Sequence, residues 1–345
     1  MSSAIDKLLG NRCLIIAEAG CNHNGSEEIA IQLVDAARET GADAVKFQAF
    51  NTEALVTQIA PQAKYQSTNT GVIESQFDMI KRLELSADAH ARIAAYCGQV
   101  GITYLCTPFD EGSADMLFEL GITAFKLGSG EITSLPLLRH IGYLSLPILL
   151  STGMSWISEV EEAVRAVRET GNNDIALLHC VSNYPADPAD INLRVLKTME
   201  LAFGLPVGYS DHTLGNEVAI AAVAVGARCI EKHFTLDRNM EGPDHTASLE
   251  PVELRRMIEQ IRNVEAAMGH GRKEPAASEA DTAAVARKSL VAARDLAAGT
   301  LLSTSDFAVK RPGNGLKPAL VDLVSGRTLT RSIRQDDLIT FDMFK

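Results

Sequence analysis

LIIAEAGCNHNGSEEIAIQLVDAARETGADAVKFQAF, residues 14–50, contains a complete strand–helix–strand unit. The apolar run at its start predicts a strand, and the segment from Ser26 to Gly41 repeats apolar residues with the helical period. Ser26 is a suitable N-cap for that helix, and Gly41 is a suitable C-terminal stop. A second apolar run, around Val45 and Phe47, predicts the next strand. Two strands joined by a helix favour a parallel sheet.

The same unit recurs along the chain, with glycine stops after later helices and polar residues where the apolar runs end. The stops are Gly101, Gly121, Gly171, Gly204 and Gly226, and the polar residues are Glu18, Lys46, Thr107, Lys126, Ser151, Ser182, Ser210 and His233. Eight such units predict a (β/α)8 TIM barrel, whose site lies at the carboxyl ends of the strands. The alternative is an open doubly wound sheet, but no G-x-G-x-x-G motif follows the first strand.

The chain is longer than one barrel requires. It has 345 residues, whereas a barrel takes about 250. We predict a barrel over residues 1–269, a polar linker over 270–284 and a small, mostly β domain over 285–345. The connection 51–85 is unusually long and polar, so we predict that it covers the barrel mouth as part of a substrate lid.

Composition restricts the classes of function. The net charge of −12 disfavours nucleic acid as a partner, although residues 281–345 contain ten Lys and Arg against seven Asp. No apolar run approaches the ~18 residues of a membrane span, and the N-terminus lacks a secretory signal pattern. We therefore predict a cytoplasmic protein with no membrane attachment. The six cysteines are scattered without a C-x-x-C pair, which favours a reducing compartment without structural zinc.

Lysine and serine residues at the strand ends indicate an anion site. Lys46 and Lys126 each interrupt an apolar run, where an ammonium group is unfavourable unless it reaches an anion or water. Two such residues favour a dianionic ligand held between them. Hydroxyl groups complete a phosphate site, from Ser129, Ser151, Ser182 and Ser210, and Thr107 is predicted to contact substrate. Each serine taken alone is more typical of a turn or a helix cap, and only the repetition on successive strands favours a functional role for the set.

Two histidines follow the seventh and eighth predicted strands. Neighbouring imidazoles from His212 and His233 could share a divalent metal with open positions for substrate oxygens. The alternative for each is a hydrogen-bonded structural role. His179 lies within a buried-looking strand and is predicted to be structural, whereas His23 in the NHNG turn could have either role. Cys180 lies beside the predicted site and is interpreted as a packed strand residue.

Carboxylates lie among these cations. Glu18 falls within IIAEAG, where an unpaired charge is costly, so it is predicted to have a partner or a shifted pKa and to act as acid or base. Glu131 lies just beyond the fourth strand. Asp211, Glu231 and Asp244 could be metal ligands, partners of those ligands or structural hydrogen-bond acceptors.

Several stretches together resemble the sialic acid synthase family, the phosphoenolpyruvate-dependent nonulosonate synthases. They are IIAEAGCNHNGS, GADAVKFQAF, LCTPFD, KLGSGEI, LSTGM, LLHCVSNYPA, VGYSDHTLG, IEKHFTLD and GPDHTASLEP. The segments ARKSLVAARDLAAG and VKRPGNG are similar to the antifreeze-like (SAF) domain that is joined to these synthases. The resemblance implies condensation of phosphoenolpyruvate with an N-acylated amino sugar, loss of phosphate, and a Mn²⁺ or Mg²⁺ cofactor.

The resemblance also implies roles for individual residues. Phosphoenolpyruvate would be held by Lys46, Lys126, Ser129, Ser151, Ser182 and Ser210, and the metal by His212 and His233. Glu18 and Glu131 would assist the chemistry, while Gln48, Tyr184 and Asp244 would face the sugar. Arg311 is similar to an arginine that the SAF domain inserts into the partner's site, which implies a domain-swapped homodimer. Ser182, followed by Asn183, stands where several family members have Asn.

The motifs favour N-acetylmannosamine as the sugar, which gives N-acetylneuraminate. The next alternative is 2,4-diacetamido-2,4,6-trideoxymannose, which gives legionaminate, and a pseudaminate precursor is less favoured. Two other classes remain open. One is an aldolase that forms a Schiff base through Lys126, and the other is a carbohydrate-binding protein without catalysis.

Overall fold

The computed structural model describes residues 3–63, 66–67, 69 and 71–345. The chain forms two compact units, Met1–Gly269 and His270–Lys345, and each is described by itself. Among the described residues, none of the helices has the length and apolar character needed to span a bilayer.

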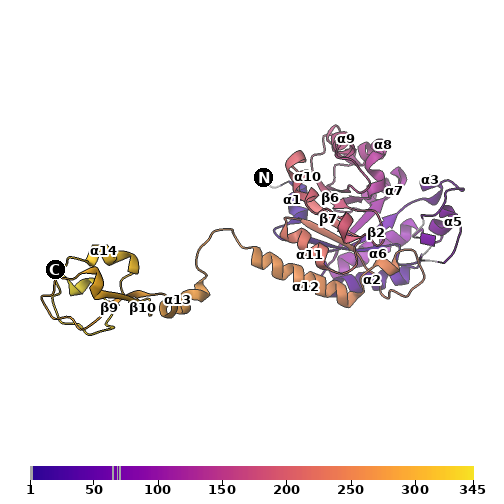
Figure 1. Ribbon diagram of the computed structural model, residues 1–345. Coiled ribbons are helices and arrows are strands. Elements are labelled where there is room, and N and C mark those ends of the chain that lie inside the picture. Colours follow the sequence, from indigo (N-terminus) through magenta and orange to yellow (C-terminus); the bar gives the residue numbers. More distant parts are fainter. Residues whose placement is uncertain (1–2, 64–65, 68, 70) are drawn as a thin grey trace. The chain divides into compact units, whose positions relative to one another are not determined.

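The first unit contains a closed barrel of parallel strands that follow one another in chain order (Figure 1). The strands are β1 (Leu14–Gly20), β2 (Ala44–Ala49), β3 (Thr103–Pro108), β4 (Phe125–Leu127), β5 (Ile148–Ser151), β6 (Ile175–Cys180), β7 (Val207–Asp211) and β8 (Cys229–His233). Closure between β1 and β8 confirms the predicted (β/α)8 barrel and excludes the open sheet.

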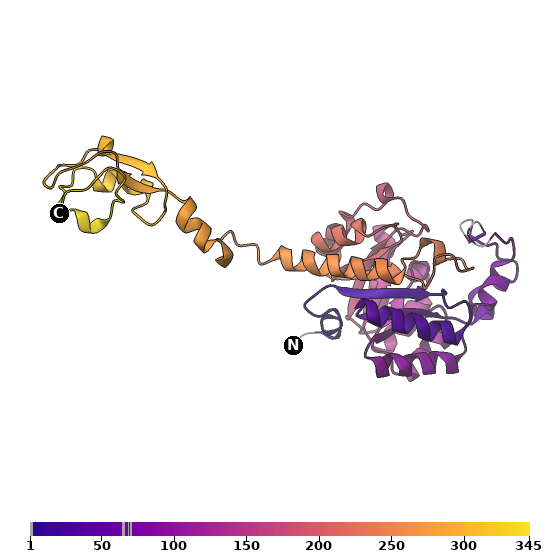
Figure 2. The same cartoon turned by 90° about the horizontal axis from the view of Figure 1, so that it is seen from below.

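Helices surround the barrel. They are α2 (Glu27–Thr40), α6 (Ala87–Val100), α7 (Glu111–Glu119), α8 (Leu135–Tyr143), α9 (Ile157–Arg168), α10 (Val195–Phe203), α11 (Glu217–Ala224) and α12 (Pro251–Met268). The predicted ends of α2 are confirmed: the Ser26 hydroxyl accepts from the Ile29 N–H, and Gly41 adopts the left-handed conformation at φ 86°. Figure 2 shows α12 alongside α2, so the last helix completes the outer layer.

The barrel interior changes character along its axis. At the amino ends of the strands it is apolar, with inward residues such as Leu14, Ala44 and Leu149 in one cluster. Ile5 and Leu9 of α1 (Ala4–Leu9) belong to the same cluster, so α1 seals this end. Toward the carboxyl ends the predicted polar residues lie within the strands, as Glu18, Lys46 and Lys126 do, or, like Ser182, just after them. The apolar packing therefore leaves one end of the barrel for a polar site.

Short helices α3 (Thr52–Leu55) and α5 (Gln76–Lys81) lie in the connection 51–85. Residues 64–65, 68 and 70 of this connection are outside the described residues.

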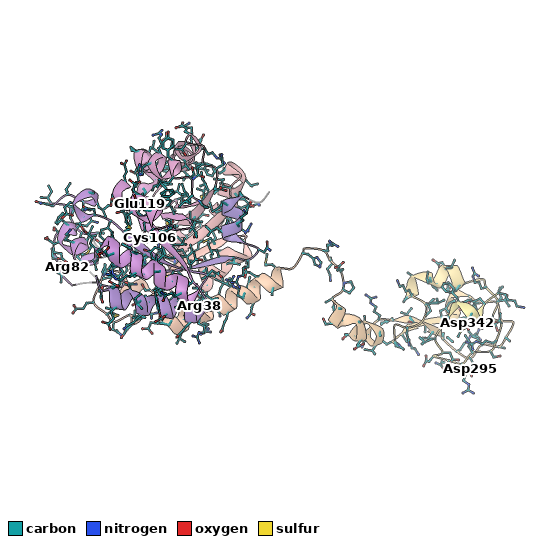
Figure 3. The ribbon with its side chains drawn as sticks, turned by 180° about the vertical axis from the view of Figure 1, so that it is seen from behind. Arg38, Arg82, Cys106, Glu119, Asp295 and Asp342 are labelled. Atoms are coloured by element: carbon teal, nitrogen blue, oxygen red, sulfur yellow. The ribbon has the colours of Figure 1, made fainter. Side chains whose placement is uncertain are left out.

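The second unit contains α13 (Ala280–Ala286), α14 (Val321–Val324) and the antiparallel pair β9 (Ser289–Ala292) and β10 (Phe307–Lys310). Isolated bridges such as Val291 to Leu338 extend the pairing. Leu290, Leu302 and Ile339 belong to a separate apolar core. In Figure 3, Asp295 and Asp342 belong to this unit, whereas Cys106 lies within the barrel. The prediction of a small β-rich second unit is confirmed.

Close packing between β7 and β8 gives a stability prediction. A Cβ on Gly208 would lie 2.7 Å from the carbonyl oxygen of Cys229 and 2.8 Å from its Cβ. We expect Gly208→Ala to destabilise the barrel by about 2 kcal/mol, because the backbone of β8 would have to move. Urea unfolding would measure this change. The control is Gly98→Ala, since exposed Gly98 on α6 has no atom within 4 Å of the new Cβ. Equal midpoints for the two variants would contradict the prediction.

Candidate active site

Strand register brings the polar ends together. Glu18 of β1 is the direct partner of Lys46 on β2 and of His233 on β8. On the other edge of β8, Ser210 of β7 is the partner of Glu231. Because the strands are parallel and closed into a barrel, these residues face one another across its carboxyl end.

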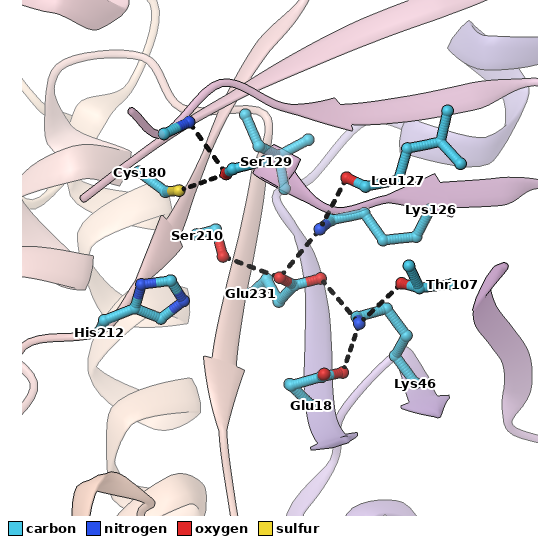
Figure 4. A network of polar contacts seen from close by, with 12 residues as sticks. Glu18, Lys46, Thr107, Lys126, Leu127, Ser129, Cys180, Ser210, His212 and Glu231 are labelled. Atoms are coloured by element: carbon cyan, nitrogen blue, oxygen red, sulfur yellow. Dashed lines mark hydrogen bonds and ion pairs between the residues drawn. The ribbon is translucent and has the colours of Figure 1, made fainter. Parts of the chain in front are cut away.

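Two carboxylates and two lysines form a continuous charged chain in this position (Figure 4). Lys46 Nζ lies 2.7 Å from Glu18 Oε2 and 4.0 Å from Glu231 Oε2, and Lys126 Nζ lies 3.1 Å from Glu231 Oε1. The four side chains are each at most 4% exposed. Lys46 is thus the partner that was predicted to exist for Glu18. Lys46 and Lys126, which were predicted to reach an anionic ligand, each have a carboxylate of the protein as a neighbour.

The two carboxylates have opposite pKa shifts. Burial raises the pKa of Glu18 to about 7, and the adjacent Lys46 offsets this only in part. Burial also acts to raise the pKa of Glu231, but Lys126 and Lys46 outweigh it and lower the pKa to about 2. Glu231 therefore stays ionised near neutral pH, while Glu18 can gain or lose a proton there. A pair of carboxylates with separated pKa values suits acid–base chemistry.

Further hydrogen bonds hold these groups in place. Ser210 Oγ donates to Glu231 Oε1 at 2.7 Å, and Lys46 Nζ donates to Thr107 Oγ1 at 3.0 Å. Gln48 Nε2 donates to Glu18 Oε1 at 3.3 Å. The register of β1 shifts between Glu18 and Gly20, where Gly20 has φ 52°. A Cβ there would lie 3.0 Å from Glu18 Oε1, so the bulge leaves room for the carboxylate.

Hydroxyl groups from three strand ends gather beside Lys126. Ser129 Oγ accepts from the Gly153 N–H at 2.9 Å and lies 3.0 Å from Cys180 Sγ. Ser182 Oγ lies 3.8 Å from the same sulfur. Ser151 Oγ is buried, with no hydrogen-bond partner within the described part of the chain. A buried hydroxyl in this state fits a site that binds a polar ligand.

The two predicted metal-binding histidines are neighbours. Their ring centroids are 5.4 Å apart, and the ring of Tyr184 packs against both, at 4.1 Å from His212 and 5.5 Å from His233. His212 Nδ1 lies 2.7 Å from the Val181 carbonyl oxygen, so Nδ1 carries the proton and Nε2 keeps its lone pair. Burial lowers the pKa of both rings, which keeps them neutral and able to bind a metal.

These residues fit a divalent cation with few protein ligands. Nδ1 of His233 and Oδ1 of Asp244 are buried without a hydrogen-bond partner among the described residues. In that same part of the chain, no group of three or more His, Cys, Asp and Glu side chains forms a closed metal site. A cation held by the two imidazoles would therefore have most of its positions left to water or substrate oxygens, as a Lewis-acid site can use.

The site opens into a cavity of about 520 Å³. Its lining includes Glu18, Lys46, Gln48, Thr107, Lys126, Ser129, Ser151, Ser182, Tyr184, Ser210, His212, His233 and Asp244. Residues from the connection 51–85 form part of its wall, including Leu55, Met79, Ile80 and Leu83, so this segment borders the site as expected of a lid. Phe50 and Phe109 add an aromatic pair with ring centroids 6.2 Å apart.

Two predicted residues lie elsewhere. Glu131 follows the lining residues Ser129 and Gly130 in the short turn Ser129–Thr133, but it does not line the cavity itself. Arg311 is exposed in the second unit. Burial raises the pKa of Glu131 to about 7.

The sequence left the roles of three acidic residues undecided, and the structure gives each a different environment. Glu231 lines the cavity and is the shared partner of both lysines; its position two residues before His233 was the available signal. Asp244 also lines the cavity and accepts from Cys21 Sγ at 3.5 Å. Asp211 faces away and pairs with buried Lys232 at 2.7 Å. His179 is structural as predicted, 2.6 Å from the Ile191 carbonyl oxygen.

Comparison with known proteins identifies the class. A model of the NeuB family matches residues 33–273, and a model of the SAF domain matches residues 287–345. The N,N'-diacetyllegionaminic acid synthase of Campylobacter jejuni subsp. jejuni serotype O:2 is 45% identical over 330 residues, 95% of this chain and 99% of that protein. The N-acetylneuraminate-9-phosphate synthase of Drosophila melanogaster is 33% identical, over 98% of each chain.

A solved structure agrees with these matches. The crystal structure of N-acetylneuraminic acid (sialic acid) synthetase from Leptospira borgpetersenii serovar Hardjo-bovis, in complex with citrate, aligns with a TM-score of 0.70 and 34% identity. The alignment covers 79% of this chain and 90% of the Leptospira protein. The chain belongs to the NeuB family of sialic acid synthases. The prediction of a phosphoenolpyruvate-dependent condensing enzyme of nonulosonate biosynthesis is confirmed.

The pKa of Glu131 gives a testable pH dependence. Its ordinary value is 4.5 and its value in the folded protein is about 7, so the folded state binds the proton more tightly. Stability should therefore fall as pH rises from 4.5 to 7. We expect Glu131→Gln to remove part of this fall and to raise the urea midpoint at pH 7.5 relative to wild type. The control is Glu119→Gln at an exposed position on α7. Parallel pH profiles for wild type and Glu131→Gln would refute the assignment.

Proposed function

We propose that phosphoenolpyruvate binds at the charged chain and the adjacent hydroxyls. Lys46 and Lys126 would face its phosphate and carboxylate, while Ser129, Ser151, Ser182 and Ser210 would donate hydrogen bonds. The observation that carries the proposal is the buried Glu18–Lys46–Glu231–Lys126 chain, with both lysines lining the cavity.

His212 and His233 would hold Mn²⁺ or Mg²⁺, which when bound supplies Lewis-acid activation of the sugar aldehyde. The new bond forms between C3 of phosphoenolpyruvate and the aldehyde carbon, and water adds at C2. Ionised Glu18 would orient that water and take its proton, and its raised pKa supports this role because it allows exchange near neutral pH. Lys46 and Lys126 would stabilise the phosphate as the C–O bond breaks. Tyr184 would orient the histidines and border the sugar.

For the sugar we propose 2,4-diacetamido-2,4,6-trideoxymannose, with N-acetylmannosamine, the first choice from the motifs, as the second candidate. Leu55, Ile80 and Leu83 give the cavity an apolar stretch of wall, and Gln66 and Gln76 of the same connection also line it. A 6-methyl group suits such a wall better than a 6-hydroxymethyl group, whose hydroxyl needs a partner. The 45% identity to a legionaminate-type synthase, against 33% to an N-acetylneuraminate-9-phosphate synthase, supports the same order.

The sugar assignment has a direct test. Purified enzyme with phosphoenolpyruvate and Mn²⁺ would be given each sugar, and phosphate release and product mass would be followed together. We expect kcat/KM to be higher for the 2,4-diacetamido-6-deoxy sugar by about tenfold or more. The two sugars differ at C4, acetamido against hydroxyl, and at C6, methyl against hydroxymethyl, and an apolar pocket discriminates the polar group at C6 alone by about this order. EDTA should abolish both reactions.

A variant pair locates the source of the preference. Met79→Gln should reduce the preference, whereas Met268→Gln, at an exposed position on α12, should leave it unchanged. A higher kcat/KM for N-acetylmannosamine would restore the first choice from the motifs. Reduction by borohydride that traps pyruvate on Lys126 would instead indicate the aldolase.

We further propose that Arg311 of one subunit completes the site of its partner in a swapped homodimer. Arg311 is exposed, and its fork of donors suits an N-acyl oxygen or a carboxylate. The basic charge of residues 281–345 is consistent with docking on an acidic barrel.

Mixed dimers test this arrangement. Arg311→Ala should abolish turnover, and so should Glu18→Ala. Equal mixing of the two should restore roughly a quarter of wild-type activity, because half of the dimers regain one intact site. Arg331→Ala, another exposed arginine of the second unit, is the control and should retain turnover. No recovery in mixed dimers verified by two affinity tags would exclude the swap.

A further inference from the structure

A second buried polar cluster lies behind the two histidines, on the side of β7 and β8 that faces the helices. It consists of Tyr209, Asp211, Thr213 and Lys232, and we call it the Asp211 cluster. These residues are each at most 1% exposed, and none of them lines the cavity. Neighbouring residues of a strand point to opposite faces, so Ser210 and Glu231 face the site while Asp211 and Lys232 face away.

The Asp211 carboxylate has a partner at every position. Oδ2 lies 2.7 Å from Lys232 Nζ, and Oδ1 accepts from the Tyr209 hydroxyl at 3.1 Å. Oδ1 also accepts from the backbone N–H of Thr213 at 2.9 Å and from its hydroxyl at 2.7 Å. Lys232 Nζ donates a second hydrogen bond to the Thr213 carbonyl oxygen at 2.5 Å. The cluster thus holds both peptide groups of Thr213.

This position determines the course of the chain around both histidines. Asp211 and Lys232 are direct partners across β7 and β8, and each immediately precedes a histidine. The pairing of the two strands ends with these residues in the described part of the chain. Beyond that point the backbone is held by the Asp211 cluster and no longer by strand pairing. Its hydrogen bonds close the turn 211–213 around His212 and connect that turn to Lys232, the residue before His233.

Stability alone does not account for a charged pair in this place. Replacing a buried ion pair by apolar residues of similar size is often neutral or stabilising, so such a pair is weak evidence for a stability role. Its hydrogen bonds are directional, however, and a cluster with all its partners present specifies one geometry. A further hydrogen bond also fixes the backbone at His212, because the Ala186 N–H donates to the His212 carbonyl oxygen at 2.9 Å.

We infer that the Asp211 cluster is a positioning device that fixes the separation and ring orientation of His212 and His233, and thereby the affinity of the enzyme for its divalent cation. This inference rests on the metal site proposed above. It assigns to Asp211 and Lys232 a role in which neither touches the metal nor the substrate.

The test is a neutral pair, Asp211→Asn with Lys232→Met, studied as the full-length metal-free protein. Mn²⁺ binding would be titrated by electron paramagnetic resonance, with thermal unfolding measured in parallel. We expect the Kd for Mn²⁺ to rise about tenfold or more, the usual effect of losing groups that orient a ligand. The matched control is Asp43→Asn with Arg262→Met, an ion pair of 2.7 Å at the amino end of β2, far along the strand from the cavity. It should change thermal stability but leave the Kd for Mn²⁺ within about twofold.

The outcomes separate the possibilities. A folded Asp211/Lys232 variant with the wild-type Kd would overturn the inference and leave the cluster a stability role only. If that variant does not fold, Thr213→Val decides, with a Kd raised about threefold supporting the inference and an unchanged Kd overturning it. If wild type itself binds no Mn²⁺, the proposed metal site fails. Nitrogen-15 spectra of the His212 ring then decide, since loss of the Nδ1–H tautomer in the neutral pair supports positioning and an unchanged tautomer contradicts it.

Discussion

The buried chain from Glu18 through Lys46 and Glu231 to Lys126 is the interaction on which the site depends. Each charge is removed from water, so each needs its neighbour, and loss of one partner from such a pair typically costs about 3–5 kcal/mol. The four residues come from β1, β2, β4 and β8, so barrel closure and charge compensation require each other. The charged chain that we propose as the anion site is therefore formed before any substrate arrives, which would reduce the reorganisation needed during the reaction.

Much of this arrangement follows from the sequence. The eight polar residues after apolar runs predicted the barrel, because few folds place a polar group at every strand end. Lys46, Lys126, His212 and His233 were found because charge and imidazole are rare in strand positions. The partner of each lysine could not be found in this way. Glu231 pairs with both lysines only because β8 closes beside β1, and this contact has no local signal in the sequence.

The same limit applies to residues that face away from the cavity. Lys232 lies between two site residues, Glu231 and His233, and strand alternation places it on the opposite face, where burial makes it depend on Asp211. Glu131 is the opposite case, a residue that the sequence placed at the site and that does not line the cavity. Its motif is specific, yet its side chain is not part of the cavity wall. The connection 51–85 could be predicted to border the mouth from its length alone. Which of its residues line the cavity, among them Leu55 and Leu83 but also Gln66 and Gln76, became clear only from the structure.

Helix α1 has a consequence for the order of events. Because Ile5 and Leu9 seal the amino end of the barrel, everything must pass through the mouth at the carboxyl end. A molecule seated on Lys46 and Lys126 would lie deeper than one that touches Leu55 or Leu83 of the connection 51–85, so under the proposed function phosphoenolpyruvate would enter before the sugar. The leaving phosphate would then be the inner product, behind the larger acid. A single open end of the barrel is thus enough to favour one order of arrival and release.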